Sequence, residues 1–290
     1  MKIAIVILNY NSSKDTIKCL NFLRQQQNVD LHIIVVDNCS QEQDRCIVEQ
    51  ECATLGIEFI VSSENRGYSA GNNIGLRRAM EKGAKYSLVI NPDVELLDKN
   101  YLAKLVAVME QDEDVVVAAT DVVTPEGVHQ NPLKPDGNWK NSFDWVKALF
   151  RKSTIDSYEF VDNYEESHEC AKVSGCCLML RMSFVVQIGY FDEYPFLYCE
   201  EPILSRQVEL AGKKMFYLAD TQAVHRHIKS EKGDLVKRFK HWQRSRIYFY
   251  RRYSNDSWLG KQISILSMRL YVLCYIIYLK LRKFICKVQG

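Results

Sequence analysis

Residues 3–11 read IAIVILNYN, an apolar run that ends in polar residues, and this stretch decides the expected fold. The run Ile3–Leu8 shows no alternation of apolar and polar side chains, which is typical of a strand buried on both faces. A helical pattern follows it from Ser13 to about Gln26. We therefore expect a strand followed by a helix, the repeating unit of a mainly parallel sheet.

The same alternation continues through the first half of the chain. Further strands are expected at His32–Val36, Ile57–Val61, Tyr86–Ile90 and Val115–Ala119. Helical patterns separate them at about Gln43–Leu55, Ser69–Glu81 and Lys99–Glu110. Regular structure fades between Thr124 and Glu169, where prolines and glycines cluster, and it resumes at Val173. These patterns predict an α/β fold with a mainly parallel central sheet flanked by helices.

The composition fits one large globular domain with an appendage. Of the 290 residues, 47% are hydrophobic and 26% are charged, which excludes wholesale disorder and a multi-span membrane protein. The ten cysteines are scattered without a C-x-x-C pair, so neither a disulfide framework nor a structural zinc site is expected. The N-terminal run lacks a small-residue cleavage site, and we interpret it as a buried strand rather than a signal peptide. We therefore expect a reducing, cytoplasmic environment.

The net charge of +2 conceals two parts of opposite sign. Residues 226–290 contain 16 Lys and Arg against 3 Asp and Glu, whereas the rest of the chain contains 22 against 33. A basic, aromatic tail on an acidic body indicates a polyanionic partner, either nucleic acid or an anionic lipid surface. No nucleic-acid motif accompanies the tail, and its aromatic residues favour the lipid surface.

One segment of this tail, Ile263–Leu279, is about long enough to span a membrane, but Arg269 and several tyrosines interrupt it. The tyrosines and the flanking basic residues favour a helix that lies in the interface of an anionic leaflet. The alternative is a helix buried in the core or in a dimer interface.

Four polar clusters follow the expected strands, at the edge where ligands bind in open α/β sheets. They are Asn9–Asn11, Asp37–Ser40, Asn65–Asn73 and Asn91–Asp93. Asp37 suits a hydrogen bond to a ribose hydroxyl or a base, or it is an N-cap or turn carboxylate for the next helix. The backbone near Gly67 could approach a phosphate to which Arg66 donates. Asp93 could hold a divalent cation together with diphosphate oxygens, or it is a turn residue.

Residues 191–201, FDEYPFLYCEE, place four carboxylates among aromatic side chains. Either Glu200 or Glu201 could act as a general base, or both mark an exposed helix start whose positive end favours acidic residues. Downstream, His225 follows a strand-like run at Met215–Leu218, and half of the six histidines fall between His225 and His241. His225 suits a metal ligand, although a single histidine also serves structural roles.

Six motifs in order, ILNYN, VVDNCS, ENRGYSAGNN, INPDV, GYFDE…FLYCEE and VHRHIKS, resemble those of family 2 glycosyltransferases. The resemblance covers about residues Lys2–Ser230 and is nearest to the rhamnosyltransferase-like branch that builds bacterial surface polysaccharides. Each motif alone is weak, whereas six in order are specific. The resemblance implies a GT-A fold, an inverting displacement and a Mg²⁺ or Mn²⁺ ion.

The matching positions imply a role for each site residue. Glu201 would be the catalytic base, with Glu200 beside it. Asp93 and His225 would hold the metal and the diphosphate. The acceptor side would include Gly175 and Asp192. The nucleotide sugar would contact Asn9, Asn11, Asp37, Asn38, Arg66, Gly67, Asn73 and Asn91.

Two motifs depart from the family pattern. The family often shows E-D-x-D-L where residues 200–204 read EEPIL. Glu201 in place of Asp keeps a base but adds one methylene, and the usual second aspartate is Ile203. The first position of the metal motif is Asn91, a neutral and poorer ligand.

The resemblance implies a GT-A catalytic domain at residues 1–230, with a nucleotide-sugar half at about 1–120 and an acceptor half at about 121–230. Residues 231–290 would form a basic, aromatic helical extension that associates with the membrane. The donor would be a nucleotide-diphosphate sugar, with dTDP-rhamnose or a UDP-hexose as candidates. The acceptor would be a hydroxyl of a saccharide that is lipid-linked through polyprenyl diphosphate and used in surface polysaccharide biosynthesis. The enzyme would be cytoplasmic and peripheral at the inner face of the cell membrane, with no nucleic-acid partner.

Two other functions fit parts of the sequence. A sugar-phosphate nucleotidyltransferase shares the layered architecture, but it normally carries a Gly-rich basic loop where this chain has Asn9–Ser13. A catalytically degenerate, membrane-docked protein that binds nucleotide sugars is favoured by the departure at residues 200–204.

Overall fold

The computed structural model describes residues 2–146, 163–226 and 235–288. Contacts group them into two units. The first unit holds residues 2–135, 163–196 and 200–226, and the second holds residues 136–146, 197–199 and 235–288. The second unit therefore combines a piece of the long central loop with the C-terminal helices. The assignment of a catalytic domain to residues 1–230 stays a proposal.

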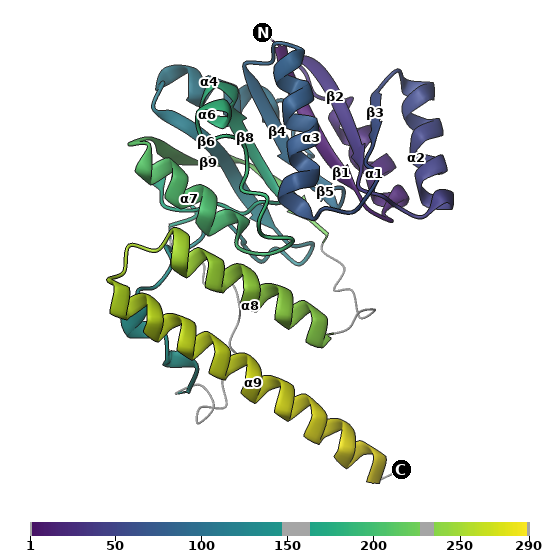
Figure 1. Ribbon diagram of the computed structural model, residues 1–290. Helices are drawn as coiled ribbons and strands as arrows, with labels where there is room; N and C mark the ends of the chain where they lie inside the picture. Colours follow the sequence, from purple (N-terminus) through teal and green to yellow (C-terminus); the bar gives the residue numbers. More distant parts are fainter. Residues whose placement is uncertain (1, 147–162, 227–234, 289–290) are drawn as a thin grey trace. The chain divides into compact units, whose positions relative to one another are not determined.

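A sheet of nine strands forms the centre of the first unit (Figure 1). The strands are β1 Lys2–Asn9, β2 Asp30–Asp37, β3 Glu58–Val61, β4 Tyr86–Ile90, β5 Val94–Glu95, β6 Val115–Val123, β7 His168–Cys170, β8 Cys177–Arg181 and β9 Lys214–His225. Their order is β3-β2-β1-β4-β8-β6-β9-β5, and β7 pairs with β9. The five strands expected in the first half of the chain are all present, as β1, β2, β3, β4 and β6.

The strand directions bring several loops to one edge of the sheet. Strands β1 to β4 pair in parallel, and β6 pairs in parallel with β9. Strand β8 lies antiparallel between β4 and β6, so β4 and β6 point the same way. The carboxyl ends of β1, β2, β4, β6 and β9 therefore lie at the edge where β8 begins. Ligands bind at this edge in open α/β sheets.

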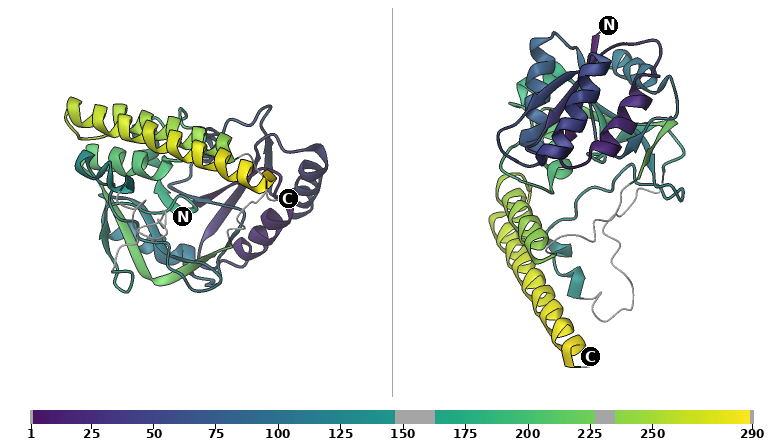
Figure 2. Two further views of the ribbon diagram at one scale, coloured as in Figure 1. Left: turned by 90° about the horizontal axis from the view of Figure 1, so that it is seen from below. Right: turned by 90° about the vertical axis from the view of Figure 1, so that its right-hand side faces the viewer.

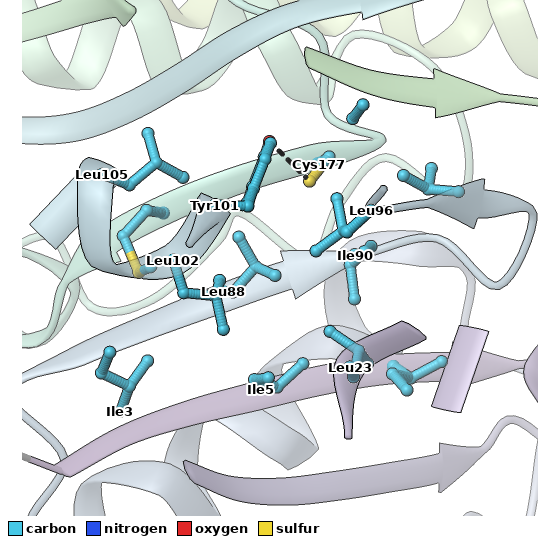
Figure 3. Packing of buried hydrophobic residues seen from close by; sticks show 14 of the residues in the cluster. Ile3, Ile5, Leu23, Leu88, Ile90, Leu96, Tyr101, Leu102, Leu105 and Cys177 are labelled. Carbon is cyan, nitrogen blue, oxygen red and sulfur yellow. Dashed lines mark hydrogen bonds between the residues drawn. The ribbon is translucent and has the colours of Figure 1, made fainter. Parts of the chain in front are cut away.

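Helices cover both faces of the sheet and confirm the expected α/β class. One face carries α1 Ser13–Leu23, α2 Glu42–Leu55 and α4 Tyr101–Gln111. The other face carries α3 Tyr68–Glu81, α6 Met182–Gln187 and α7 Glu200–Leu210. Figure 3 shows part of the first core, where Tyr101 lies among aliphatic side chains and its hydroxyl reaches Cys177 Sγ at 3.3 Å.

Helix α3 lies unusually close to β1 because it carries glycines on its inner face. A Cβ at Gly71 would lie 2.6 Å from Leu8 Cδ1, and a Cβ at Gly75 would come under 3.0 Å from Val6. Larger side chains would push the helix away from the sheet. The close packing brings the beginning of α3 to the sheet edge described above.

The second unit contains the 3₁₀ turn η1 Trp139–Asn141 and two long helices, α8 Leu235–Arg252 and α9 Trp258–Val288. The two helices run side by side in both views of Figure 2 and pack against each other. Within α9, residues Trp258–Leu279 are long and apolar enough to cross a membrane by length and composition, with a mean hydropathy of 1.6. The predicted C-terminal helices are thus present, whereas their association with a membrane stays a prediction.

Candidate active site

A buried hydrogen-bond network joins the loops that follow β1 and β2. Asn9 and Asp37 occupy paired last positions of these parallel strands, and both are fully buried. Asn9 Nδ2 donates to Asp37 Oδ2 (2.9 Å), and Ser40 N donates to Asp37 Oδ1 (2.9 Å). Both carboxylate oxygens therefore hold the turn together, in agreement with the turn role considered for Asp37. Direct contacts of Asn9 and Asp37 with a nucleotide sugar stay predictions.

The exposed tips of these two loops are also connected. Asn11 N donates to Ser40 Oγ (2.9 Å), and Asn11 Oδ1 accepts from Gln41 N (2.8 Å). Asn11 and Cys39 adopt left-handed backbone conformations, with φ of 52° and 64°. Non-glycine residues in this region are uncommon and gather at functional sites. Asn11 is exposed and is thus available to a ligand.

Asn38 fixes the Gly-rich turn that leads into α3. Its Nδ2 donates to Asn65 Oδ1 (3.0 Å) and to Gly67 O (3.1 Å). Gly67 has a φ of 89°, and a Cβ there would lie well under 3.0 Å from Phe196 O. The backbone that lies close to Gly67 is thus that of Phe196, in the loop of residues 191–196. A phosphate contact at Gly67 stays a prediction.

Asn73 and Arg66 both contact this same loop. Asn73 is fully buried, its Nδ2 donates to Phe191 O and Glu193 Oε1 (both 2.9 Å), and its Oδ1 accepts from Phe191 N (3.0 Å). These bonds give Asn73 a positioning role, and its contact with the nucleotide sugar stays a prediction. Arg66 Nη2 donates to Glu193 Oε2 (3.0 Å), but its side chain remains about half exposed and can reach a ligand.

A groove of about 600 Å³ follows the outer side of α3, with Arg66, Arg77 and Glu193 on its border. Asp93 and Glu201 are not among the residues that line it. The predicted metal ligand and the predicted base therefore lie outside this groove.

Asp93 and His225 lie together because β5 pairs with the end of β9. In this short antiparallel ladder Val94 is opposite His225, and Arg226 N donates to Asp93 O (2.9 Å). Asp93 Oδ1 lies 3.4 Å from His225 Nε2, and His225 Nδ1 lies 3.0 Å from Gln130 Oε1. Two residues that are 132 positions apart in sequence thus present an oxygen and a nitrogen to the same place.

The spacing of this pair fits a divalent cation. Two neighbouring ligands of an octahedral Mg²⁺ ion lie about 3 Å apart, given metal–oxygen distances of about 2.0–2.1 Å. Among residues 2–146, 163–226 and 235–288, no group of three or more His, Cys, Asp or Glu could hold a metal ion. A cation bound by Asp93 and His225 would therefore take its other ligands from water and substrate phosphates, as is usual for Mg²⁺.

The protonation of His225 reflects competing effects. Burial acts against the charged imidazolium, but Cys176 and the Asp93 carboxylate outweigh it and raise the pKa of His225 to about 10. A metal ligand must be the neutral imidazole, so metal binding here would release a proton.

Glu201 lies against the turn that precedes β8. Gly175 N donates to Glu201 Oε1 (3.3 Å), and Tyr68 OH donates to Gly175 O (2.5 Å). A side chain at Gly175 would lie 3.4 Å from both Glu201 Oε1 and Tyr68 OH. Burial, followed by the nearby Glu200 and Glu201, raises the pKa of Tyr68 well above its usual value. Tyr68 thus remains a hydrogen-bond donor that orients the turn under the carboxylate.

The two carboxylate groups of the site are connected through one backbone bond. Asn91 N donates to Cys176 O (2.7 Å), so the turn with Gly175 is tied to the loop with Asp93. This bond uses only the backbone of Asn91, and the contact of its side chain with the nucleotide sugar stays a prediction.

Helix α7 begins at Glu200, so Glu200 and Glu201 both lie in its first turn, where the helix dipole favours acidic residues. Both glutamates are half-buried, so they mark a helix start that is only partly exposed, and their catalytic role stays a prediction. Asp192 Oδ1 accepts from Tyr194 N (2.9 Å) and closes a turn, and its acceptor role stays a prediction. His227 and Ser230 of the VHRHIKS motif lie outside the described residues.

Sequence reasoning missed four residues of this site: Tyr68, Gln130, Cys176 and Glu193. Tyr68 and Glu193 lie inside the motifs ENRGYSAGNN and GYFDE, so the motifs themselves could have indicated both residues. Gln130 lies in a stretch without periodicity, and its contact with His225 depends on the β5–β9 pairing.

Comparison with known proteins identifies the family of this chain. The family model for glycosyl transferase family 2 matches residues 4–187, more than half of the chain. The chain belongs to this family. It is therefore a glycosyltransferase, as the six motifs predicted, and the nucleotidyltransferase alternative loses its support.

Two curated relatives extend the match over most of the chain. The low-salt glycan biosynthesis hexosyltransferase Agl10 of Haloferax volcanii is 31% identical over 202 residues, which are 69% of this chain and 59% of Agl10. The rhamnosyltransferase WbbL of Escherichia coli K12 is 25% identical over 232 residues, which are 76% of this chain and 82% of WbbL. The glycosyltransferase thus spans less than two thirds of the length of Agl10.

Solved structures confirm the GT-A fold. Staphylococcus aureus TarS 1–349 in complex with UDP superposes with a TM-score of 0.57 at 18% identity, over 92% of this chain and 71% of TarS. The mannosyltransferase PcManGT of Pyrobaculum calidifontis, in complex with GDP-Man and Mn²⁺, gives a TM-score of 0.58 at 15% identity, over 93% and 69% of the two chains.

Proposed function

We propose that this glycosyltransferase moves a hexose from a nucleotide-diphosphate sugar to a hydroxyl of a saccharide acceptor, with inversion at the anomeric carbon. One observation carries the proposal: two reactive groups meet at the same sheet edge. The first is the pair of Asp93 and His225, whose side chains lie 3.4 Å apart. The second is Glu201 on the backbone of Gly175. The first suits a departing diphosphate and the second suits an attacking hydroxyl.

In the proposed reaction Glu201 is the general base. It accepts the proton of the acceptor hydroxyl while that oxygen bonds to the anomeric carbon. The bond from this carbon to the diphosphate oxygen breaks on the opposite face, and the nucleoside diphosphate leaves with the electron pair. Gly175 N–H orients the Glu201 carboxylate before the acceptor arrives, and Tyr68 OH holds Gly175 through its carbonyl oxygen, which lowers the entropic cost of the step.

Asp93 and His225 are the proposed ligands of a Mg²⁺ or Mn²⁺ ion, which would neutralise the negative charge that develops on the departing diphosphate. The 3.4 Å separation of their side chains supports this role. The Mn²⁺ in the PcManGT complex supports it too, since PcManGT shares the fold.

The donor candidates come from the relatives. WbbL is named as a rhamnosyltransferase and TarS was solved with UDP, so dTDP-rhamnose and a UDP-hexose are both proposed donors. The exposed Asn11 and Arg66 are the side chains best placed to contact the nucleotide. Asn9, Asn38 and Asn73 are buried and would act by holding the loops that carry them.

We place the reaction at the cytoplasmic face of the cell membrane, on a saccharide carried by polyprenyl diphosphate, in surface polysaccharide biosynthesis. The excess of basic residues in the C-terminal region supports a membrane location. The name of Agl10, a glycan biosynthesis hexosyltransferase, supports a role in glycan assembly.

Thermal stabilisation by UDP-, dTDP- and GDP-sugars, each with and without Mn²⁺, tests the proposal. One nucleotide is expected to raise the melting temperature, with a larger shift when Mn²⁺ is present, because a ligand stabilises the state that binds it. Stabilisation of the folded protein by none of them would favour the degenerate alternative that the EEPIL sequence at residues 200–204 raised.

A further inference from the structure

Two exposed stripes of different chemistry lie in the second unit, one on each long helix. On α8 the exposed side chains of residues 236–252 are all basic; they are Lys237, Arg238, Lys240, Arg244, Arg251 and Arg252. Lys237, Lys240, Arg244 and Arg251 recur at helical spacing and therefore share one face. The other stripe, on α9, is aliphatic, with the exposed Gln262 and Arg269 at its edge.

Helix α9 is apolar on two sides, but only one of them is covered within the second unit. Ile265, Met268 and Val272 are buried. Leu259, Leu266, Leu270, Leu273 and Ile277 are 38–60% exposed and follow one another at spacings of three, four and seven residues, along one face. An exposed aliphatic stripe of this length on a soluble protein marks an interaction surface.

The covered side of α9 is fixed by the other two elements of the unit. Ser142 Oγ lies 2.7 Å from Ser264 Oγ, and Trp145 Nε1 donates to Ser267 Oγ (2.8 Å). Helix α8 covers the adjacent side, where the rings of Phe239 and Tyr275 lie 4.1 Å apart. The aliphatic stripe therefore belongs to a helix whose orientation in the unit is set by specific contacts.

These contacts also show at which level of α9 the basic stripe of α8 lies. Phe239 packs on Tyr275, and Trp242 packs on Tyr271 at 5.7 Å between ring centres. Both tyrosines fall inside the apolar segment Trp258–Leu279. Lys240 lies between Phe239 and Trp242 in sequence, so a membrane-spanning α9 would carry this lysine and its basic neighbours into the hydrocarbon. That placement is strongly unfavourable for Lys and Arg.

We propose that α8 and α9 form a monotopic docking surface that lies in the plane of an anionic leaflet and does not span it. The aliphatic stripe of α9 enters the acyl region, and the basic stripe of α8 meets the phosphates of the lipid headgroups. Trp258, which is 75% exposed at the start of α9, suits the membrane interface. The inference rests on the membrane location within the proposed function and adds the residues of the surface and their orientation toward the leaflet.

Binding of the full chain to phosphatidylcholine vesicles, with and without phosphatidylglycerol, tests the basic stripe. The triple variant Lys237→Gln, Lys240→Gln, Arg251→Gln is expected to bind the anionic vesicles about 100-fold more weakly, at about fivefold for each residue. The matched control is Lys99→Gln, Lys134→Gln, Arg24→Gln, which removes three exposed basic residues of the first unit. An equal loss in the control would overturn the role of the stripe.

The aliphatic stripe is tested with Leu266→Asn, Leu273→Asn, which is expected to weaken binding to both kinds of vesicle by about 100-fold. The matched control Leu97→Asn, Leu210→Asn changes two leucines that are 61% and 64% exposed in the first unit. Alkaline carbonate is expected to release the wild type from membranes. Retention after carbonate would show a spanning helix, and a dimer without vesicle affinity would show that a second copy covers the stripe; either result overturns the proposal.

Donor binding separates this inference from the proposed function. Both stripe variants are expected to keep the nucleotide-sugar thermal shift of the wild type, because the substitutions lie outside the first unit. If the wild type shows the thermal shift but does not bind vesicles, the docking surface alone is overturned. Vesicle binding without any thermal shift would overturn the proposed function alone.

Discussion

The substitution Gly67→Ala tests how the Gly-rich turn is coupled to the loop that precedes α7. Gly67 has φ 89° and ψ −172°, a conformation that costs other residues about 1–3 kcal/mol. A Cβ there would also come well under 3.0 Å from Phe196 O, so the loop must move. That movement breaks the Tyr68 N–Phe196 O hydrogen bond of 3.0 Å, worth about 1 kcal/mol. We expect a loss of about 2–4 kcal/mol in the free energy of unfolding.

Gly56→Ala is the matched control. Gly56 ends α2 with φ 66° and ψ 28°, and nothing lies within 4 Å of the position of a Cβ. The substitution therefore introduces left-handed strain, at about 1–2 kcal/mol, without a clash. The difference between the two variants in the free energy of unfolding measures the energetic cost of displacing the loop.

Urea unfolding followed by circular dichroism gives both free energies. All four tryptophans lie in the second unit, at positions 139, 145, 242 and 258, so tryptophan fluorescence follows that unit separately. Gly67→Ala is expected to shift the dichroism transition, to leave the fluorescence transition in place and to lose sugar transfer. Stability equal to that of Gly56→Ala, together with wild-type transfer, would refute the coupling of Gly67 to the loop.

Three further predictions concern single residues. Asp93→Asn is expected to abolish the Mn²⁺-dependent part of the donor thermal shift and to keep the part seen without metal; an unchanged Mn²⁺ effect would remove Asp93 from the site. Arg181 is 9% exposed and donates to Val115 O and Tyr86 OH, so Arg181→Met should cost about 3 kcal/mol or more in urea unfolding, and a loss below about 1 kcal/mol would contradict this. Burial acts to raise the pKa of Asp44, but hydrogen bonds from Ser13 N and Asn9 outweigh it and lower the pKa. Above about pH 4 the wild type should therefore melt at a higher temperature than Asp44→Asn, and the gap should close as the pH falls through the lowered pKa; a gap that persists in acid would contradict this.

The fold could be predicted from sequence wherever the signal was local. The apolar runs of β1, β2 and β4 are unbroken, and each is followed by a helical pattern, so strand, helix and parallel pairing follow from periodicity. The antiparallel direction of β8 could not be predicted, because the apolar run CLMLR at Cys177–Arg181 fits a parallel and an antiparallel strand equally well. The two-residue strand β5 is too short to show any period.

The site was predictable to the extent that it sits at strand ends. Asn9, Asp37 and Asn38 were expected to gather at one edge, and hydrogen bonds from Asn9 Nδ2 to Asp37 and from Asn38 N to Asn9 O connect them there. Their burial was not expected, because a polar residue at a strand end gives no measure of its exposure. The positioning role of Asn73 depends on its hydrogen bond with Phe191, 118 positions away, and a contact over this distance leaves no local pattern in the sequence.

The same limit applies to the central loop. Its prolines and glycines indicated irregular structure, but the contacts of Trp139 and Trp145 with α9 link residues more than 115 positions apart. Only the three-dimensional structure places residues 136–146 with the C-terminal helices.

The central claim is that Glu201 is the base of a sugar transfer, and Glu201→Gln tests it most directly. Donor binding by thermal shift and release of nucleoside diphosphate in the presence of membrane acceptor lipids are measured on the same preparations. The variant is expected to bind the donor as the wild type does and to transfer about 10²–10⁴ times more slowly, the usual contribution of a general base. Transfer at the wild-type rate, or loss of donor binding together with transfer, would contradict the account.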